Sequence, residues 1–135
     1  MASVRIRVEE REHHVGPDPR PSHCPGGRTV LASADERGRT IGEARAAICG
    51  CEGSTDAWIE AVTVEPGWRG AGVARRLVAA LLRELERRGA AEVYTLVHRS
   101  DVALAPFFRE IGFRERPYAC LGLALREPGG GRPAR

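Results

Sequence analysis

One segment constrains the fold more than any other, because a strand, a glycine turn, a helix and a second strand follow one another in it. Residues 57–64 are apolar and rich in β-branched side chains, which predicts a central strand. From Arg69, apolar residues recur every four positions as far as Gly89, which predicts a helix with a glycine cap. Residues 92–98 predict the next strand. Two strands joined through a helix pair in parallel by a right-handed crossover, so the segment predicts an α/β fold.

The rest of the chain predicts antiparallel strands around this crossover. Residues 4–8 alternate apolar and charged side chains, and residues 29–34 and 40–49 flank a turn at 35–38. Proline-rich residues 10–27 predict a loop, residues 102–111 a short helix ending at Gly112, and residues 113–125 an extended strand. We therefore expect one α/β domain over residues 1–126, with a mixed, mostly antiparallel sheet, and a flexible tail over 127–135.

Charge is distributed unevenly along the chain. The 135 residues carry a net charge of +3, and all 21 basic residues are arginine. Residues 1–67 hold 8 arginines and 11 acids, whereas residues 68–135 hold 13 arginines and 7 acids. Acids interspersed with the arginines, and few aromatic residues, argue against a nucleic-acid partner. An anion site is therefore expected in the second half.

The sequence gives no sign of a membrane or metal protein. No apolar run approaches the ~20 residues that cross a bilayer. The first residues lack the apolar core of a signal peptide, so we expect a cytoplasmic protein with reduced thiols. One residue separates Cys49 from Cys51, whereas zinc sites usually place two to four between their cysteines, so no metal is expected.

The turn between the central strand and the helix has the properties of an anion site. Gly70 and Gly72 lack a Cβ atom, so other atoms can approach the backbone closely. The first amides of the following helix have no partners within it, and the helix dipole favours negative charge there. Arg69, Arg75 and Arg76 surround the turn. It is not a Walker loop, which ends in Gly-Lys-Ser/Thr, nor a Rossmann fingerprint, whose third glycine is here Arg75.

Two motifs resemble the GNAT superfamily of acyl-CoA-dependent N-acyltransferases. The family signature Gln/Arg-x-x-Gly-x-Gly/Ala is similar to Arg69-Gly70-Ala71-Gly72-Val73-Ala74, which follows Val64-x-Pro66. The segment from Ala105 to Phe113 resembles the family's short helix that ends in Gly-Phe. The resemblance covers residues 57–113. It implies a GNAT-like fold with acetyl-CoA, or another acyl-CoA, as cofactor and direct attack by an amine on the thioester.

The resemblance also assigns cofactor contacts. Backbone amides from Arg69 to Ala74 would hold the pyrophosphate, with Arg75 or Arg76 assisting. Backbone groups of Val62 and Val64 would bind the pantetheine arm, where strand 57–64 splays from strand 92–98. Further expected cofactor contacts are Asp101 and Phe108, although Asp101 is favoured as a cap of the short helix instead.

Glu60 is the first candidate for the catalytic base. It stands in an apolar strand two residues before Val62, so we expect both on one face, with burial raising the pKa of the carboxyl. An equally weighted alternative is an exposed Glu60 paired with an arginine. His98 is a second candidate base at a strand end, where a solvated histidine is the more common situation.

This chain departs from the family pattern at the position of the general acid. Many members carry a tyrosine where this chain has Phe108, so Tyr118, Tyr94 or water would have to protonate the leaving thiolate. The proline-rich residues 10–27 replace helices that usually shape the acceptor site, and the last strands look short. We therefore expect an open acceptor site and a homodimer. The predicted function is acetyl transfer to an unidentified amine, and the alternative is a non-catalytic acyl-CoA-binding or regulatory module.

Overall fold

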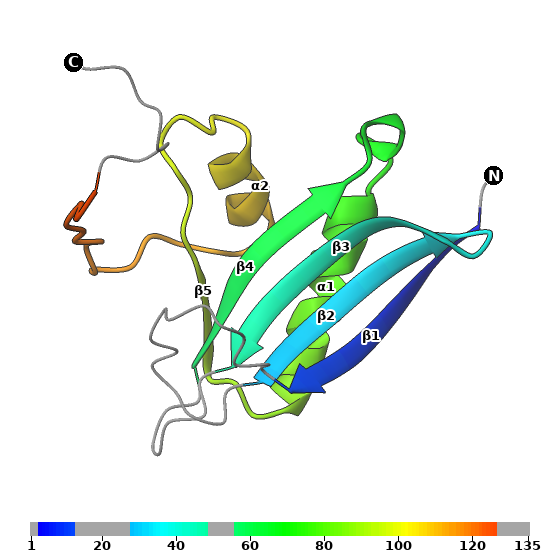
Figure 1. Cartoon of the computed structure of the whole chain (residues 1–135), viewed down its shortest axis with the longest axis horizontal. Coiled ribbons are helices and arrows are strands. Elements are labelled where there is room, and N and C mark those ends of the chain that lie inside the picture. The colour runs from blue at the N-terminus through cyan, green and yellow to red at the C-terminus, as the bar shows by residue number, and fades with distance from the viewer. Residues whose placement is uncertain (1–2, 13–27, 49–55, 127–135) are drawn as a thin grey trace. The chain divides into compact units, whose positions relative to one another are not determined.

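A five-stranded sheet covered on one face by a long helix forms the first part of the protein (Figure 1). The computed structural model describes residues 3–12, 28–48 and 56–126. Its contacts divide the chain into two compact units, Met1–Val102 and Ala103–Arg135. Each unit is described by itself below.

The strands of the first unit lie side by side in chain order. They are β1 (Val4–Glu12), β2 (Arg28–Glu36), β3 (Arg39–Ile48), β4 (Asp56–Val64) and β5 (Glu92–Thr95). The first three junctions are antiparallel, and β4 pairs with β5 in parallel. Helix α1 (Val73–Arg87) makes the connection between β4 and β5. The α/β class and the mixed, mostly antiparallel sheet with one parallel crossover are therefore confirmed.

Helix α1 supplies six of the fifteen buried hydrophobic residues that the structure describes in this unit. Its buried residues follow the predicted apolar stripe and comprise Val73, Leu77, Val78, Ala80, Leu81 and Leu85. They pack against β2 and β3, where the residues from Val30 to Ala34 and Ile41, Ala44 and Ala46 are also buried. The helix ends in the predicted glycine cap, since Gly89 has φ +90° and the Ala90 amide donates to the Leu85 carbonyl at 3.0 Å.

Several predicted boundaries were wrong. β1 continues to Glu12 instead of ending at residue 8, and the strand predicted over 92–98 ends at Thr95. Helix α1 begins at Val73 and not at Arg69, because a short 3₁₀ helix, η1 (Pro66–Trp68), and two left-handed glycines come first. The four-residue apolar repeat carries no information on the backbone conformation of Gly70 and Gly72, so it could not show where the helix begins.

β4 contains a bulge that reverses the expected facing of its side chains. Arg45 of β3 pairs with Ala61, and the next residue Ala46 pairs with Ile59, so Glu60 is the extra residue. Val62 pairs with buried Ala44 and lies on the face covered by α1.

The second unit contains helix α2 (Leu104–Ile111). Phe108 is 3% exposed and makes edge-to-face contacts with Phe107 and Phe113, with ring centroids 5.2 and 5.0 Å apart. Gly112, with φ +127°, ends the helix as predicted, and the Phe113 amide donates to the Phe108 carbonyl at 3.0 Å. Phe108 is therefore the packing centre of this helix.

The last predicted strand is wrong for the residues that the structure describes. Residues 113–126 contain no strand, although Leu121, Leu123 and Leu125 alternate as a strand would require. These three side chains are 83–92% exposed. An alternating pattern forms a strand only when a neighbouring strand takes up its backbone hydrogen bonds, and none does so here. The proposed tail, 127–135, lies outside the described residues.

Candidate acyl-CoA site

The glycine turn between β4 and α1 forms an open backbone surface. Gly70 has φ +82° and Gly72 has φ +79°, a conformation that residues with a Cβ atom adopt at a cost. A Cβ atom added to either glycine would meet nothing within 4 Å. The space above both residues is therefore open to a ligand, which fits a phosphate group lying against the backbone.

The amides of this turn divide into two groups. Those of Arg69 and Ala71 donate within the turn, to the carbonyls of Pro66 and Trp68 at 3.3 and 3.4 Å. The first helical bond of α1 is from the Arg76 amide to the Gly72 carbonyl, so the amides of the first helical turn precede the helical ladder. Of the predicted pyrophosphate donors Arg69 to Ala74, the backbone amides of Gly70, Gly72, Val73 and Ala74 therefore remain candidates.

The three arginines around the turn have different surroundings. Arg69 Nε donates to the carbonyl of Val64 at 3.3 Å, which fastens the turn to the end of β4. Arg75 is exposed on the first turn of α1. Arg76 Nη2 donates to the carbonyl of Val4 at 2.9 Å, so its guanidinium lies toward β1. The predicted role of Arg75 with the phosphates stays a prediction, and the Arg76 guanidinium is held by the Val4 carbonyl.

The parallel ladder between β4 and β5 ends half-way along β4. Paired positions run from Asp56–Glu92 to Ile59–Thr95, and β4 continues for five residues beyond them. At the last pair the Thr95 hydroxyl donates to the Ile59 carbonyl at 3.2 Å. In the first unit, the part of β4 beyond Ile59 therefore has an edge that β5 leaves uncovered.

Backbone groups of Val62 and Val64 point to that uncovered edge. The Glu65 amide donates to the Ile41 carbonyl of β3 at 2.9 Å, so the backbone N–H and C=O groups of Glu65 are directed toward β3. The direction of the backbone N–H and C=O groups alternates along an antiparallel strand, so those of Val64 and Val62 are directed away from β3. The hydrogen bond from Arg69 to the Val64 carbonyl agrees with this direction.

Glu60 lies on the exposed face of the sheet and not in the core. Its side chain is 42% exposed and accepts a hydrogen bond from Arg45 Nε at 3.3 Å. The predicted burial of Glu60, and a common face with Val62, are therefore wrong, because the bulge places the two residues on opposite faces. The alternative, an exposed carboxylate paired with an arginine, is what the structure shows.

An aromatic pair lies on the same exposed face. Trp58, two residues before Glu60, is 42% exposed, and its ring centroid is 5.0 Å from that of Tyr94 on β5. Neither Trp58 nor Arg45 could be singled out from the sequence, because only the strand register places Trp58 beside Tyr94 and Arg45 beside Glu60. The exposed face thus combines a carboxylate with an aromatic surface, a chemistry that suits cations.

His98 follows β5 and is held in a turn. Its carbonyl accepts the Asp101 amide at 2.9 Å, and its Nδ1 accepts the Ser100 amide at 3.1 Å, with the Ser100 hydroxyl 2.7 Å away. A neutral imidazole that accepts at Nδ1 carries its hydrogen on Nε2. In this tautomer Nε2 is the ring atom able to donate, and the role of His98 as a base stays a prediction.

The remaining predicted site residues are Asp101, Phe108 and Tyr118, whose expected roles in cofactor binding and catalysis stay predictions. Helix α2 has no side-chain cap, and its N-cap residue is Ala103, so the predicted capping by Asp101 is wrong. Phe108 packs within its own unit, and Tyr118 is 71% exposed in that unit. Cys49 and Cys51 lie outside the described residues.

The described part of the chain has neither a helix that could span a membrane nor a cluster of metal-ligand side chains. None of its helices combines the length and hydropathy that a membrane crossing requires. Residues 3–12, 28–48 and 56–126 contain no group of three or more His, Cys, Asp or Glu side chains that could hold a metal ion.

Comparison with known proteins agrees with this architecture. The model of the acetyltransferase (GNAT) family matches residues 4–113. No curated protein sequence matches the chain. The chain therefore belongs to the acetyltransferase (GNAT) family, which confirms the resemblance drawn from the two motifs.

Solved acetyltransferases share the fold. The aminoglycoside N-acetyltransferase AAC(6')-Iy in complex with CoA is 26% identical, with a TM-score of 0.63 over 71% of this chain and 75% of that one. An acetyltransferase of Trypanosoma brucei is 25% identical, with a TM-score of 0.61 over 72% and 69% of the two chains. The aminoglycoside acetyltransferase meta-AAC0020 from an uncultured soil metagenomic sample, in complex with sisomicin, is 14% identical and shows the fold alone, with a TM-score of 0.67 over 90% and 97%.

Proposed function

We propose that this protein transfers an acetyl group from acetyl-CoA to a cationic amine by direct attack of the amine on the thioester. One observation supports it above the others: the uncovered edge of β4, with outward backbone groups at Val62 and Val64, leads directly into the open glycine turn. The extended pantetheine arm, which contains amides, fits the uncovered edge of β4, and a pyrophosphate fits the glycine turn. Family membership supports the same cofactor.

The chain's own groups then have distinct roles. Gly70, Gly72, Val73 and Ala74 bind the pyrophosphate through their amides, and Arg75 adds positive charge. Val62 and Val64 hold the pantetheine arm as a strand neighbour would. Acetyl-CoA supplies the acyl group already activated as a thioester.

The exposed face of the sheet supplies the acceptor side of the reaction. Glu60 accepts a proton from the acceptor ammonium, directly or through water, and the amine attacks once it is neutral. Trp58 and Tyr94 offer the aromatic surface that a cationic acceptor favours. His98 Nε2 donates a hydrogen bond to the thioester carbonyl oxygen as negative charge develops on it. Tyr118 remains the predicted acid for the leaving thiolate.

Small cationic amines are the acceptor class that this surface favours. Several solved relatives are aminoglycoside acetyltransferases, and one of them was crystallised with a bisubstrate analogue joining CoA to acetylneamine. A polycationic amine also fits the surface of this chain that combines the Glu60 carboxylate with the rings of Trp58 and Tyr94.

A homodimer is part of the proposal. β5 is an edge strand of four residues, and the described residues provide no strand beyond it. Such an edge suits pairing with a second copy. Light scattering should give twice the chain mass, and a monomeric mass at working concentration contradicts this part.

Cofactor binding and turnover test the proposal separately. Calorimetry with acetyl-CoA should show one site, and ligand at 100 times Kd should stabilise the fold by about 2.7 kcal/mol. Release of free CoA is then measured with a panel of aminoglycosides, polyamines and amino acids. Binding without turnover on any amine identifies a non-catalytic module, and absence of binding overturns the proposal.

A further inference from the structure

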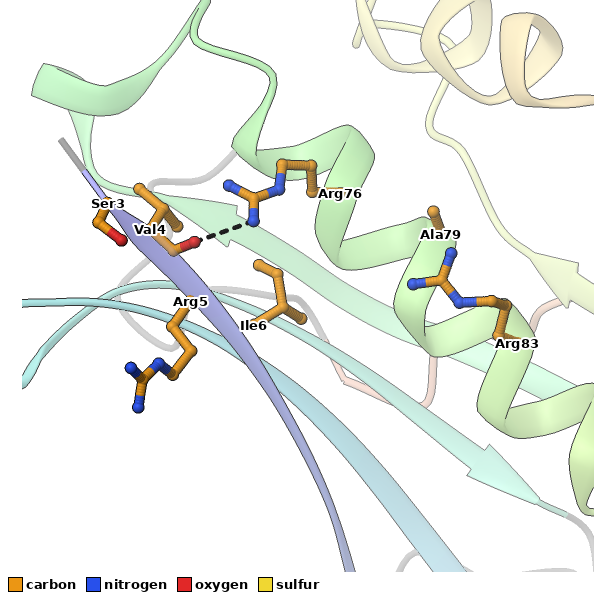
Figure 2. A pocket seen from close by; sticks show the side chains of 7 residues that line it. All are labelled: Ser3, Val4, Arg5, Ile6, Arg76, Ala79 and Arg83. Atoms are coloured by element: carbon orange, nitrogen blue, oxygen red, sulfur yellow. Dashed lines mark hydrogen bonds between the residues drawn. The ribbon is translucent and has the colours of Figure 1, made fainter. Parts of the chain in front are cut away.

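A groove between β1 and α1 lies on the side of the helix away from β5, and its Arg76 end begins one helical turn after Gly72. It has a volume of about 560 Å³ and is lined by Ser3, Val4, Arg5, Ile6, Arg76, Ala79 and Arg83 (Figure 2). Figure 2 shows Arg76 and Arg83 reaching from α1 toward β1, with Ile6 pointing toward the helix between them. Arg5 points to the opposite face of the strand. The groove is therefore mainly polar, with Ile6 inside it and two guanidinium groups along its helical wall.

The direction of the β1 backbone follows from the ladder pattern of the sheet. The backbone groups of Glu65 face β3, so those of Thr63 also face β3, and those of its partner Glu43 face β4. Ser33 pairs with Glu43, so the backbone groups of Ser33 face β1, where it pairs with Arg7. The odd-numbered residues of β1 are thus hydrogen-bonded to β2.

The even-numbered residues of β1 consequently present their N–H and C=O groups at the edge of the sheet. β1 is the terminal strand in the sheet order, and Figure 1 shows no strand beside it. The one edge group with a partner identified in the described part of the chain is the Val4 carbonyl, which accepts Arg76 Nη2 at 2.9 Å. Ile6 and Val8 therefore offer backbone donors and acceptors to an added strand.

The charge of the groove has one sign. Arg83 makes no hydrogen bond or ion pair with any described residue. Arg76 and Arg83 are seven residues apart on one face of α1, so their Cα atoms are separated by about 10.5 Å along the helix. Acidic side chains two or four residues apart on an extended chain, about 7 to 14 Å, span a similar distance.

From these observations we propose that the edge of β1 and the groove beside α1 bind an extended acidic peptide segment of a partner protein. The peptide adds a strand to β1, its backbone pairs with Ile6 and Val8, and its acidic side chains meet Arg76 and Arg83. Two features select for it: backbone pairing requires an extended chain, and the two arginines require negative charge.

A second copy of this chain fits the groove less well than an acidic segment. Antiparallel pairing of two β1 strands about a two-fold axis places both α1 helices on the same face of the joined sheet. Arg76 and Arg83 would then approach the same arginines of the other copy, and like charges oppose such pairing.

Fluorescence anisotropy with a labelled heptapeptide, Thr-Glu-Val-Glu-Val-Glu-Thr, tests the charge requirement. The matched control replaces its three Glu with Lys, and only the acidic peptide should bind. Arg83→Ala should weaken binding by up to about fivefold, the upper value for one exposed ion pair. Arg99→Ala is the control for a loss of charge, because Arg99 is exposed in the loop after β5. Equal binding of both peptides, or equal affinity of Arg83→Ala and Arg99→Ala, overturns the proposal.

The backbone requirement has its own test. Val8→Pro removes an edge-facing N–H and leaves the ladder with β2 intact, so it should weaken peptide binding about fivefold, the value of one hydrogen bond. In case this variant fails to fold, amide chemical shifts of the natural chain are recorded with the acidic peptide. The largest changes should fall on the amides of Ile6, Val8 and Glu10. Changes confined to other elements, or a dimer in sedimentation equilibrium that Val8→Pro dissociates, overturn the proposal.

Discussion

Arg45 Nε lies 3.3 Å from Glu60 Oε1, across the point where β4 carries one more residue than β3. The bulge turns Glu60 toward the exposed face, and the arginine holds its carboxylate there. A buried carboxylate would meet an acceptor only after solvent had been removed from both. Here the carboxylate is open to an incoming cation, which can replace the guanidinium as its partner.

Glu60→Gln should lower kcat about 100-fold, since general-base catalysis contributes at least that factor. The amide keeps the shape of the side chain but cannot accept the ammonium proton. Glu43→Gln is the matched control, because Glu43 is an exposed carboxylate of the neighbouring strand. Rates of CoA release at saturating acetyl-CoA measure the effect. Equal rates for the two variants would remove Glu60 from the mechanism.

Gly72→Ala should weaken acetyl-CoA binding, while Gly38→Ala should not. Both glycines have φ +79°, and a Cβ atom added to either one would meet nothing within 4 Å. Both substitutions should therefore reduce the free energy of unfolding by a similar amount, about 1 to 2 kcal/mol. Gly38 lies in the β2–β3 turn, so calorimetry should detect weaker binding only for Gly72→Ala. Unchanged affinity in that variant contradicts a phosphate site at the turn.

His98→Gln should retain much of the activity that His98→Ala loses. The glutamine amide can still donate a hydrogen bond, whereas alanine cannot, and loss of one such donor costs about 100-fold in kcat. The ¹⁵N shifts of the imidazole should also show hydrogen on Nε2 near pH 8. If Gln and Ala are equally impaired, His98 acts by proton transfer and the donor role is wrong.

Gly42→Ala should destabilise the fold by about 1 to 3 kcal/mol through overpacking. The added Cβ atom would lie 3.0 Å from the Thr63 carbonyl oxygen and 3.1 Å from Leu77 Cδ1. Gly67→Ala is the control, because nothing lies within 4 Å of its Cβ position. A double-mutant cycle with Leu77→Val should recover part of the loss. Urea unfolding at one pH measures all five free energies, and equal values for the Gly42 and Gly67 variants contradict the close contact.

Acid should destabilise the protein partly through Glu84. The hydrogen bond from Arg87, with a further one from Arg88, holds the pKa of the Glu84 carboxyl below its usual 4.5. A pKa lowered by folding contributes stability above the unfolded-state value, and that contribution is lost as pH falls through the folded-state value. Glu84→Gln should therefore flatten the fall in unfolding free energy between about pH 5 and pH 3. An unchanged slope contradicts this linkage.

The sequence alone determined the crossover and the glycine turn. A run of apolar β-branched residues, a four-residue apolar repeat and paired glycines are local patterns, and local geometry dictates what each can form. For the same reason Gly89 and Gly112 could be predicted as helix ends, because a left-handed residue is required there.

Only the tertiary structure decided which way the residues of β4 face and which backbone groups lie at the edges of the sheet. Alternation predicts facing only while the register is regular, and the extra residue at Glu60 depends on how β3 pairs with β4. Arg45 is 15 residues from Glu60, and Tyr94 is 36 from Trp58, so no local pattern could connect either pair. Pairing across strands is a long-range property, and the candidate site depends on it.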